Sequence, residues 1–204
     1  AWMNCFWTFW NRRDEMNPLE QELHQRNLPE LMRQNSKEPV ETPAQWERRR
    51  QEIGEILSRE FAGFPTRLAC RSQKEVVRID RDSYGGKAET QYCELKIRSD
   101  FSSASVPFTL TVPKGSSPAP IFFYLAFTPE IVDGIGEEVI DHGYAIANVC
   151  YQDIAADYFD GHMTGLGRFC TRNPYDSWGK LRIWAWCMSR IADVLLDDPG
   201  IDQK

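Results

Sequence analysis

The chain has 204 residues, of which 42% are hydrophobic, 12% aromatic and 26% charged, and its formal net charge is -6. This aromatic content excludes a largely disordered chain, because it supplies the material of a hydrophobic core. The acidic balance argues against a nucleic-acid-binding protein, which would carry a basic face. No run approaches the roughly 20 apolar residues of a membrane-spanning helix.

The N-terminal region separates into an aromatic stretch and a polar stretch. Residues 1–10 are rich in aromatic side chains and are followed by Arg12 and Arg13, whereas a signal peptide has its positive charge first. We therefore expect a cytoplasmic protein. Residues 12–41 are polar and contain three prolines, which predicts an extended arm with one short helical turn. This arm is expected to cover residues 1–41, and residues 42–204 to form the folded domain.

A helix is predicted to begin after Thr42. Thr42 is a favourable N-cap, Pro43 suits the first helical position, and Gln45 completes a capping box. We expect the arginines at 48–50 to face water and pair with neighbouring glutamates; a nucleic-acid patch is the alternative. Gly63 is expected to end the helix. One apolar stripe has helical spacing: Trp46, Ile53, Ile56, Leu57 and Phe61.

The pattern then changes to strands. Val77 and Ile79 precede a turn at 84–86, and apolar residues alternate with polar ones over 93–97 and 106–112. Alternation of this kind is typical of strands with one buried face, so antiparallel pairing is predicted.

Two later runs, 121–127 and 144–150, are apolar on both faces, which favours strands covered on both sides. Residues 136–142 between them predict a short helix that Gly143 ends. A strand, a helix and a strand in this order predict two parallel neighbours joined by a right-handed crossover.

A long helix is predicted over 178–196, capped by Asp176 or Ser177, after a loop at 152–176. It is so apolar that we expect it to be buried nearly all round, with Trp184 and Trp186 in the core. A further central strand would be needed to cover it. The pattern therefore predicts an α/β sheet that is cut short.

The sequence holds no complete catalytic motif. No serine or cysteine lies in a Gly-X-Ser-X-Gly elbow, and no glycine-rich phosphate loop is present. The cysteines form no Cys-X-X-Cys motif, so we interpret Cys150 and Cys187 as buried free thiols. The acidic loop with Asp153, Asp157, Asp160 and His162 matches no calcium loop. We expect it to be a solvated loop, with no metal and no cofactor.

Several segments together resemble the α/β-hydrolase superfamily, in particular glucuronoyl-esterase-like and acetylxylan-esterase-like proteins. The resemblance covers roughly residues 40–204. The segments that carry it are 42–53, 60–65, Val106-Pro107-Phe108, Val112-Pro113-Lys114, Gly143-Tyr144-Ala145, Asp176-Ser177-Trp178-Gly179-Lys180, Trp184-Ala185-Trp186, Ser189-Arg190, Asp198-Pro199 and Ile201-Asp202.

The resemblance implies the N-terminal portion of an α/β-hydrolase fold, in which antiparallel strands lead into a parallel central sheet, truncated before the nucleophile elbow. In that family the serine, the acid and the histidine follow the point that corresponds to Lys204, so this chain is expected to carry no triad residue and to be inactive alone. Relatives have Asn-Phe-X-Gly where this chain has Ala126 and Pro129. Proline has no N–H, which leaves Phe127 and Thr128 as oxyanion-loop candidates; a plain loop without such a role is the alternative.

The implied activity of the intact protein is hydrolysis of carbohydrate esters, glucuronoyl or acetyl esters of plant cell-wall polysaccharide, by a serine esterase. The expected partner is the carbohydrate ester substrate, with no nucleic acid and no membrane. The alternative is a non-catalytic half-hydrolase that acts as a binding or interaction module and needs a partner for its exposed sheet edge.

Overall fold

The computed structural model describes residues 18–26, 28–64, 69–131, 134–159, 161–169 and 178–202. Within them the chain divides into two compact units, the first ending at Glu55 and the second beginning at Ile56. The division into an arm at 1–41 and a domain at 42–204 stays a prediction. No helix among the described residues is long and apolar enough to cross a membrane.

The first unit is built around a buried arginine of helix α3 (Pro43–Leu57), which follows the shorter α2 (Pro18–Gln25). The capping box is confirmed: the Gln45 N–H donates to Thr42 Oγ1 at 3.2 Å and the Thr42 N–H to Gln45 Oε1 at 2.9 Å. The expectation that Arg49 faces water is wrong, because it is 5% exposed. Its guanidinium donates to the carbonyl oxygens of Glu30 and Leu31, so the segment before the helix supplies acceptors for its N–H groups. Its charge is paired with Glu52 of the same helix at 3.0 Å, so the predicted pairing with a neighbouring glutamate is confirmed for Arg49.

The predicted apolar stripe of α3 is not a buried face. Trp46, Ile56 and Leu57 are exposed, as is Phe61 in the following π-helix η2 (Ser58–Ala62). The helical spacing of apolar residues therefore predicted the helix correctly. It did not predict burial, because burial depends on whether another segment packs against the apolar face. The continuous helical stretch of α3 and η2 ends as expected at Gly63, the C-cap of η2, whose φ of 75° favours glycine.

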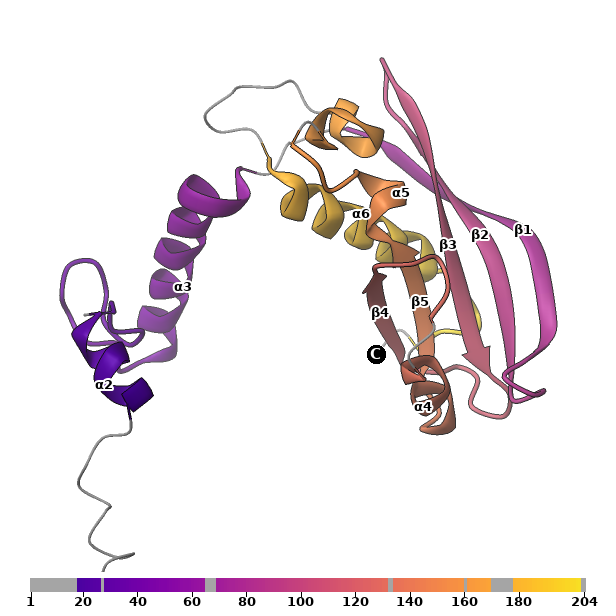
Figure 1. Ribbon diagram of the computed structural model, residues 1–204, viewed down its shortest axis with the longest axis horizontal. Coiled ribbons are helices and arrows are strands. Elements are labelled where there is room, and N and C mark those ends of the chain that lie inside the picture. The colour runs from indigo at the N-terminus through magenta and orange to yellow at the C-terminus, as the bar shows by residue number, and fades with distance from the viewer. Residues whose placement is uncertain are drawn as a thin grey trace, which may run out of the picture. The chain divides into compact units, whose positions relative to one another are not determined.

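The second unit contains one five-stranded sheet in the order β1-β2-β3-β5-β4 (Figure 1). The first three strands are antiparallel, β5 is antiparallel to β3, and β4 is parallel to β5. The predicted passage from antiparallel strands into a parallel pair is confirmed. The strands are β1 (Arg71–Ser83), β2 (Ala88–Arg98), β3 (Ser103–Pro113), β4 (Ile121–Ala126) and β5 (Ala145–Cys150).

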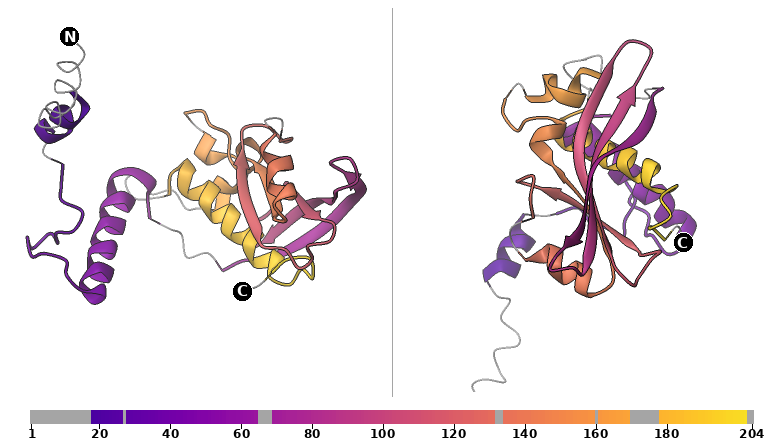
Figure 2. Two further views of the ribbon diagram at one scale, coloured as in Figure 1. Left: turned by 90° about the horizontal axis from the view of Figure 1, so that it is seen from below. Right: turned by 90° about the vertical axis from the view of Figure 1, so that its right-hand side faces the viewer.

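Helices cover the two faces of this sheet, and Figure 2 shows α6 (Lys180–Leu195) running along one of them. The crossover helix α4 (Ile135–Asp141) joins β4 to β5 as predicted, and Gly143 follows it with a φ of 80°. The main core lies between α6 and the sheet, and it includes the sheet residues Leu95, Leu110 and Val149. A smaller cluster under α4 includes Ile146. Shorter helices are α5 (Tyr151–Ile154), η3 (Gly161–Met163) and η4 (Gly165–Phe169).

Two expectations about burial need correction. Helix α6 is not buried all round: its fully buried residues form one stripe, and Leu181 is exposed. The helix lies on the sheet that is present, so it does not by itself require a further strand. Strand β5 is buried throughout as predicted, but β4 is an edge strand whose Phe122 and Phe123 are substantially exposed.

The cap of α6 also differs from the prediction. Asp176 and Ser177 lie outside the described residues, and Gly179 occupies the N-cap position with extended backbone and no side-chain cap bond. Its N–H instead donates to the Ala62 carbonyl oxygen at 2.8 Å. The start of α6 is therefore tied to the end of η2 by a main-chain hydrogen bond.

Candidate functional site at the carboxyl ends of β4 and β5

A short loop, 127–131, leaves the carboxyl end of β4 directly beside the carboxyl end of β5, where Ala126 and Cys150 are paired. Two side-chain hydrogen bonds fix the loop. Asn148 Nδ2 donates to the Pro129 carbonyl oxygen at 2.8 Å, and Thr128 Oγ1 donates to the Glu130 carbonyl oxygen at 2.7 Å. Carboxyl ends of strands in α/β sheets are where ligands bind, so this loop is in the expected place for a site.

The main-chain N–H groups at the start of this loop are available. Among the described residues, neither the Phe127 N–H nor the Thr128 N–H has a hydrogen-bond partner. Pro129 contributes no donor. Two adjacent free donors on a loop pinned through Asn148 are the kind of groups that stabilise a developing oxyanion. The part that these two residues play in catalysis stays a prediction.

An aromatic row forms one wall beside the loop. The Phe127 ring is 82% exposed and meets Tyr151 edge to face, with centroids 5.6 Å apart. Tyr151 meets Trp184 in the same way at 5.1 Å, and Trp184 Nε1 donates to the Ala155 carbonyl oxygen at 2.9 Å. The row therefore runs from a fixed, partly buried indole to an exposed phenyl ring at the loop.

A cavity of about 310 Å³ lies beneath the loop, on the sheet face opposite α6. Asn148, which is 2% exposed, lines it, and its buried Oδ1 has no hydrogen-bond partner among the described residues. Burial raises the pKa of the Asp153 carboxyl above its ordinary value. The cavity is lined by Val77, Tyr92, Cys93, Glu94, Pro107, Phe108, Thr109, Pro129, Glu130, Asn148, Cys150 and Asp153.

The histidines do not converge on this loop. His24 lies in α2 of the first unit, and His142 Nδ1 is 2.8 Å from the Glu138 carbonyl oxygen at the end of α4. The side chain of His162 lies outside the described part of the structure. The described residues thus bring no histidine to the candidate oxyanion donors.

The buried thiols are unsuited to nucleophilic attack. Burial raises the pKa of Cys187 to about 12 and that of Cys93 to about 11, so both are neutral near pH 7. The prediction of buried free thiols is confirmed for Cys187 and Cys150. The described residues contain no group of three metal-ligating side chains.

The acidic loop that follows β5 is tied to α6. Asp157 Oδ1 accepts a hydrogen bond from Lys180 Nζ at 2.5 Å. Of the other residues predicted for this loop, Asp160 and the side chain of His162 lie outside the described residues. An ion pair with a helix therefore accounts for Asp157.

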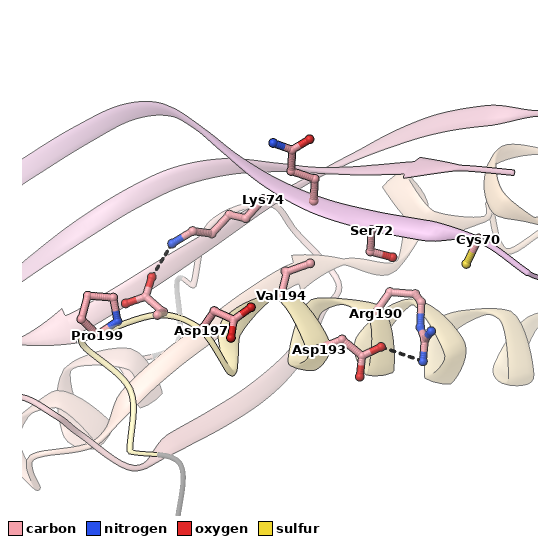
Figure 3. A pocket seen from close by; sticks show the side chains of 10 residues that line it. Cys70, Ser72, Lys74, Arg190, Asp193, Val194, Asp197 and Pro199 are labelled. Atoms are coloured by element: carbon pink, nitrogen blue, oxygen red, sulfur yellow. Dashed lines mark hydrogen bonds and ion pairs between the residues drawn. The ribbon is translucent and has the colours of Figure 1, made fainter.

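A second cavity, of about 510 Å³, separates β1 from the C-terminal part of α6 (Figure 3). Two ion pairs lie in its lining: Lys74 pairs with Asp198, and Arg190 pairs with Asp193 at 2.9 Å. Figure 3 shows the Arg190–Asp193 pair on α6. Lys74 also donates to Gln91 at 3.1 Å. The Lys74–Asp198 pair connects the edge strand β1 to the turn after α6, whereas the Arg190–Asp193 pair lies within α6. Neither pair places a nucleophile with a base.

Comparison with known proteins gives a likeness of structure only. No protein-family model matches the chain, and no curated protein sequence matches it. Solved glucuronoyl esterases do match: that from Solibacter usitatus has a TM-score of 0.72 at 24% identity, over 86% of this chain and 55% of its own. The glucuronoyl esterase of carbohydrate esterase family 15 from Teredinibacter turnerae matches with a TM-score of 0.66 at 23% identity, over 87% of this chain and 49% of its own.

A third solved structure is the Sporotrichum thermophile glucuronoyl esterase in complex with methyl 4-O-methyl-beta-D-glucopyranuronate, with a TM-score of 0.57 at 22% identity over 86% of this chain and 43% of its own. The chain thus has the fold of one part of these glucuronoyl esterases and spans about half of their length. The resemblance predicted from the sequence is confirmed as a resemblance of fold.

Sequence reasoning missed Asn148 and Tyr151, which hold the loop and its aromatic wall. A signal for Asn148 was present, because it is a single amide inside an otherwise apolar run of six residues. A buried polar side chain requires a partner, and here that partner is the main chain of the loop. Tyr151 carried no such signal, since aromatic residues are frequent throughout this chain.

Proposed function

We propose that the chain forms the amino-terminal half of a serine carboxylic-ester hydrolase that acts on carbohydrate esters, with glucuronoyl esters as the first candidates. The observation that carries this proposal is the fold match to several glucuronoyl esterases over 86% or more of the chain, at about half of their length. The loop after β4 also supports the proposal, because the N–H groups of Phe127 and Thr128 have no partner among the described residues and could bind an oxyanion.

In this proposal residues 127 and 128 supply oxyanion donors, and the nucleophile, the histidine and the acid come from outside residues 1–204. The serine would attack the ester carbonyl, and the main-chain N–H groups would bind the oxygen as it gains negative charge. Asn148 positions the loop because its amide fixes the Pro129 carbonyl. The Phe127–Tyr151–Trp184 row would present an aromatic surface next to the reacting carbonyl.

An esterase assay tests the proposal. The purified chain is expected to give no turnover of 4-nitrophenyl acetate or of a methyl glucuronate ester above buffer. The reading frame after codon 204 is expected to encode a strand that leads into a serine elbow, and the protein from that longer frame is expected to hydrolyse the glucuronate ester. Turnover by the purified chain that scales with its concentration contradicts the absence of a triad.

The role of the loop has a sharper test in the longer protein. Thr128→Pro removes one N–H donor, and the loss of one such donor costs about 10²–10³ in kcat. Thr128→Ala keeps the N–H and removes only the hydroxyl that donates to Glu130, so it is the matched control and should retain most of the activity. Equal loss in both variants would assign the effect to loop structure and not to the donor.

A second candidate function, an interaction module without catalysis, is favoured by one observation, the uncovered strand β4 at the edge of the sheet. The same reading frame separates the two candidates. A stop codon directly after codon 204 in the gene favours the module, and an open frame that encodes the serine elbow favours the enzyme.

A further inference from the structure

The sheet face opposite α6 carries a row of polar side chains beside the loop after β4. Asn148 of β5 is paired with Thr109 of β3, and Thr109 is paired with Tyr92 of β2. The next residues along these strands, such as Leu110 and Ala147, belong to the main core under α6, so the polar row faces the other side. This row lines the cavity of about 310 Å³ that lies beneath the loop.

A smaller cavity, of about 250 Å³, continues the first one. Both are lined by Tyr92, Thr109, Pro129, Glu130 and Asn148, so together they form one groove, which we call the polar groove. Pockets for small molecules have volumes upward of roughly 300 Å³, and the larger cavity alone reaches that size. The polar groove therefore has room for a small organic molecule.

The lining of the polar groove is acidic. Among the described residues that line it there is no lysine, arginine or histidine. Its carboxylates belong to Asp80, Glu94, Glu130 and Asp153. A cleft lined by one sign of charge concentrates ions of the opposite sign. The polar groove therefore favours a cation over an anion or a neutral molecule.

Only two of these four carboxylates have partners that account for them. Glu94 pairs with Lys96, and Asp80 accepts a main-chain N–H from two residues further along the chain. The carboxylates of Glu130 and Asp153 have no hydrogen-bond or ion-pair partner among the described residues. Burial raises the pKa of the Asp153 carboxyl, and no cation opposes that shift. Two acceptors in the polar groove thus lack a donor.

The amide of Asn148 is an independent sign of a missing donor. Its Nδ2 donates to the Pro129 carbonyl oxygen at 2.8 Å. Its Oδ1 is buried and has no hydrogen-bond partner among the described residues, although the residue is only 2% exposed. Buried polar atoms in proteins nearly always have a partner. A third acceptor of the same groove therefore calls for an N–H or O–H group from a bound molecule.

Two basic side chains on the neighbouring strands are engaged elsewhere. The Arg78 guanidinium lies over the Tyr92 ring, 3.6 Å from its centroid, and Lys96 is held by Glu94. Neither basic residue lines the polar groove. The protein therefore does not itself supply the donor that the three acceptors lack.

A bare metal ion fits this lining less well than an organic cation. The described residues contain no group of three metal-ligating acidic, histidine or cysteine side chains. Hard metal ions require six or more oxygen ligands in the case of calcium, or near-ideal octahedral geometry in the case of magnesium. The larger cavity is also lined by Val77, Pro107 and Phe108, which favour a ligand with an apolar body.

We propose that the polar groove is a binding site for a small organic ammonium ion. The N–H groups of the ligand donate to Asn148 Oδ1 and to the carboxylates of Glu130 and Asp153, and its apolar body lies against the Tyr92 ring. The same Asn148 amide holds the Pro129 carbonyl of the candidate oxyanion loop, so the ligand binds next to the support of that loop. The inference does not depend on the proposed esterase activity.

The test is a titration of the full chain with benzylammonium chloride at pH 7 and low ionic strength, followed by NMR of the main-chain and side-chain amides. Benzyl alcohol has nearly the same shape without the charge and is titrated in parallel. The Asn148 side-chain amide and the main-chain amides of Glu130 and Asp153 are expected to shift and to saturate with benzylammonium. Benzyl alcohol is expected to bind at least about tenfold more weakly.

Two variants remove one charge each without a change of size. Asp153→Asn and Glu130→Gln are each expected to weaken benzylammonium binding about fivefold. Glu137→Gln removes the same charge from an exposed position on α4 that does not line the polar groove, and it is the matched control. Its affinity should stay within about twofold of the unchanged chain. Unchanged amide spectra away from the groove verify that each variant is folded.

Three results would overturn the proposal. Equal affinity for benzylammonium and benzyl alcohol would show that only the apolar lining binds. Saturable shifts of the same amides with magnesium or calcium chloride, and none with benzylammonium, would assign the polar groove to a metal ion. No saturable shift with any of these probes would mean that water alone fills it. None of these measurements involves ester hydrolysis, so failure here and failure of the proposed function are separate findings.

Discussion

Strands β4 and β5 are neighbours of equal length and similar composition, yet they have opposite environments. They pair residue by residue from Ile121–Ala145 to Ala126–Cys150. All six residues of β5 are buried, whereas only Ala126 of β4 is. An apolar run therefore indicates a strand that is suited to burial on both sides, and its position in the sheet decides whether the burial is realised.

The largest effect on stability is expected from a charge placed at the paired positions Phe123 of β4 and Ala147 of β5. Ala147→Asp puts a carboxylate without a partner into the main core, and an uncompensated buried charge costs about 3–5 kcal/mol, comparable to the whole stability of a domain. Phe123→Asp at the paired position of β4 should leave the protein folded. Circular dichroism and urea unfolding measure the difference. Equal destabilisation would show that the edge of β4 is covered in solution.

A second comparison removes apolar volume at the next pair. Ile146→Ala deletes a side chain that is 1% exposed and should lower the free energy of unfolding by about 3 kcal/mol. Phe122→Ala, at the paired position, removes a ring that is half exposed, so about 1 kcal/mol is expected. Urea midpoints at constant slope give both values. A larger loss at Phe122 would reverse the assignment of the two environments.

A smaller loss of stability is expected from a change in the turn after α6, which contains Asp198. Asp198→Ala removes the carboxylate that pairs with Lys74 and accepts the Gly200 N–H, which should cost about 2 kcal/mol. Asp141→Ala breaks the exposed pair with Lys87 and is the control, with little change expected. Amide exchange at Asp202 should quicken only in the first variant. Unchanged exchange there would mean that Asp198 does not hold the Asp202 N–H in its hydrogen bond to the Ala119 carbonyl oxygen.

Thiol labelling gives the finest distinction between the strands. A thiol in Phe123→Cys should react with a thiol reagent at pH 8 within minutes, while Cys150 of β5 and Cys187 of α6 should react only on unfolding. The pKa of Cys187 is raised by burial, so folding favours its protonated form. The stability that this protonated thiol contributes to the folded state is fully present below pH 9, near the pKa of the unfolded thiol, and is lost as the pH rises toward 12. Fast labelling of Cys187 at pH 8 would contradict its burial.

The sequence predicted most elements of the second unit because their patterns are local. Alternation over 93–97 and 106–112, the turn at 84–86 and the strand–helix–strand order all lead to the observed sheet. The predictions that failed concern burial. Arg49 is buried because the segment before its helix supplies carbonyl acceptors, and α6 is buried along one stripe only because the sheet reaches one side of it.

The sequence predicted two residues of the candidate site, and the structure shows the whole loop 127–131 together with the side chains that contact it. Phe127 and Thr128 were identified through resemblance alone, and the structure adds what holds their loop, the Asn148 amide beneath Pro129. A hydrogen bond across 19 positions of the chain has no local signature in the sequence. The same holds for the contact of Phe127 with Tyr151.

The sequence by itself determined the periods of the elements, the capping box at Thr42 and the parallel pair of apolar strands, because these depend on neighbours along the chain. Only the tertiary structure decided that β4 lies at the edge of the described sheet, and that Ile201 forms a parallel bridge with Ala119, just before β4 begins. Such facts depend on which segments meet in space, and the hydrophobic effect that drives the meeting has no direction of its own.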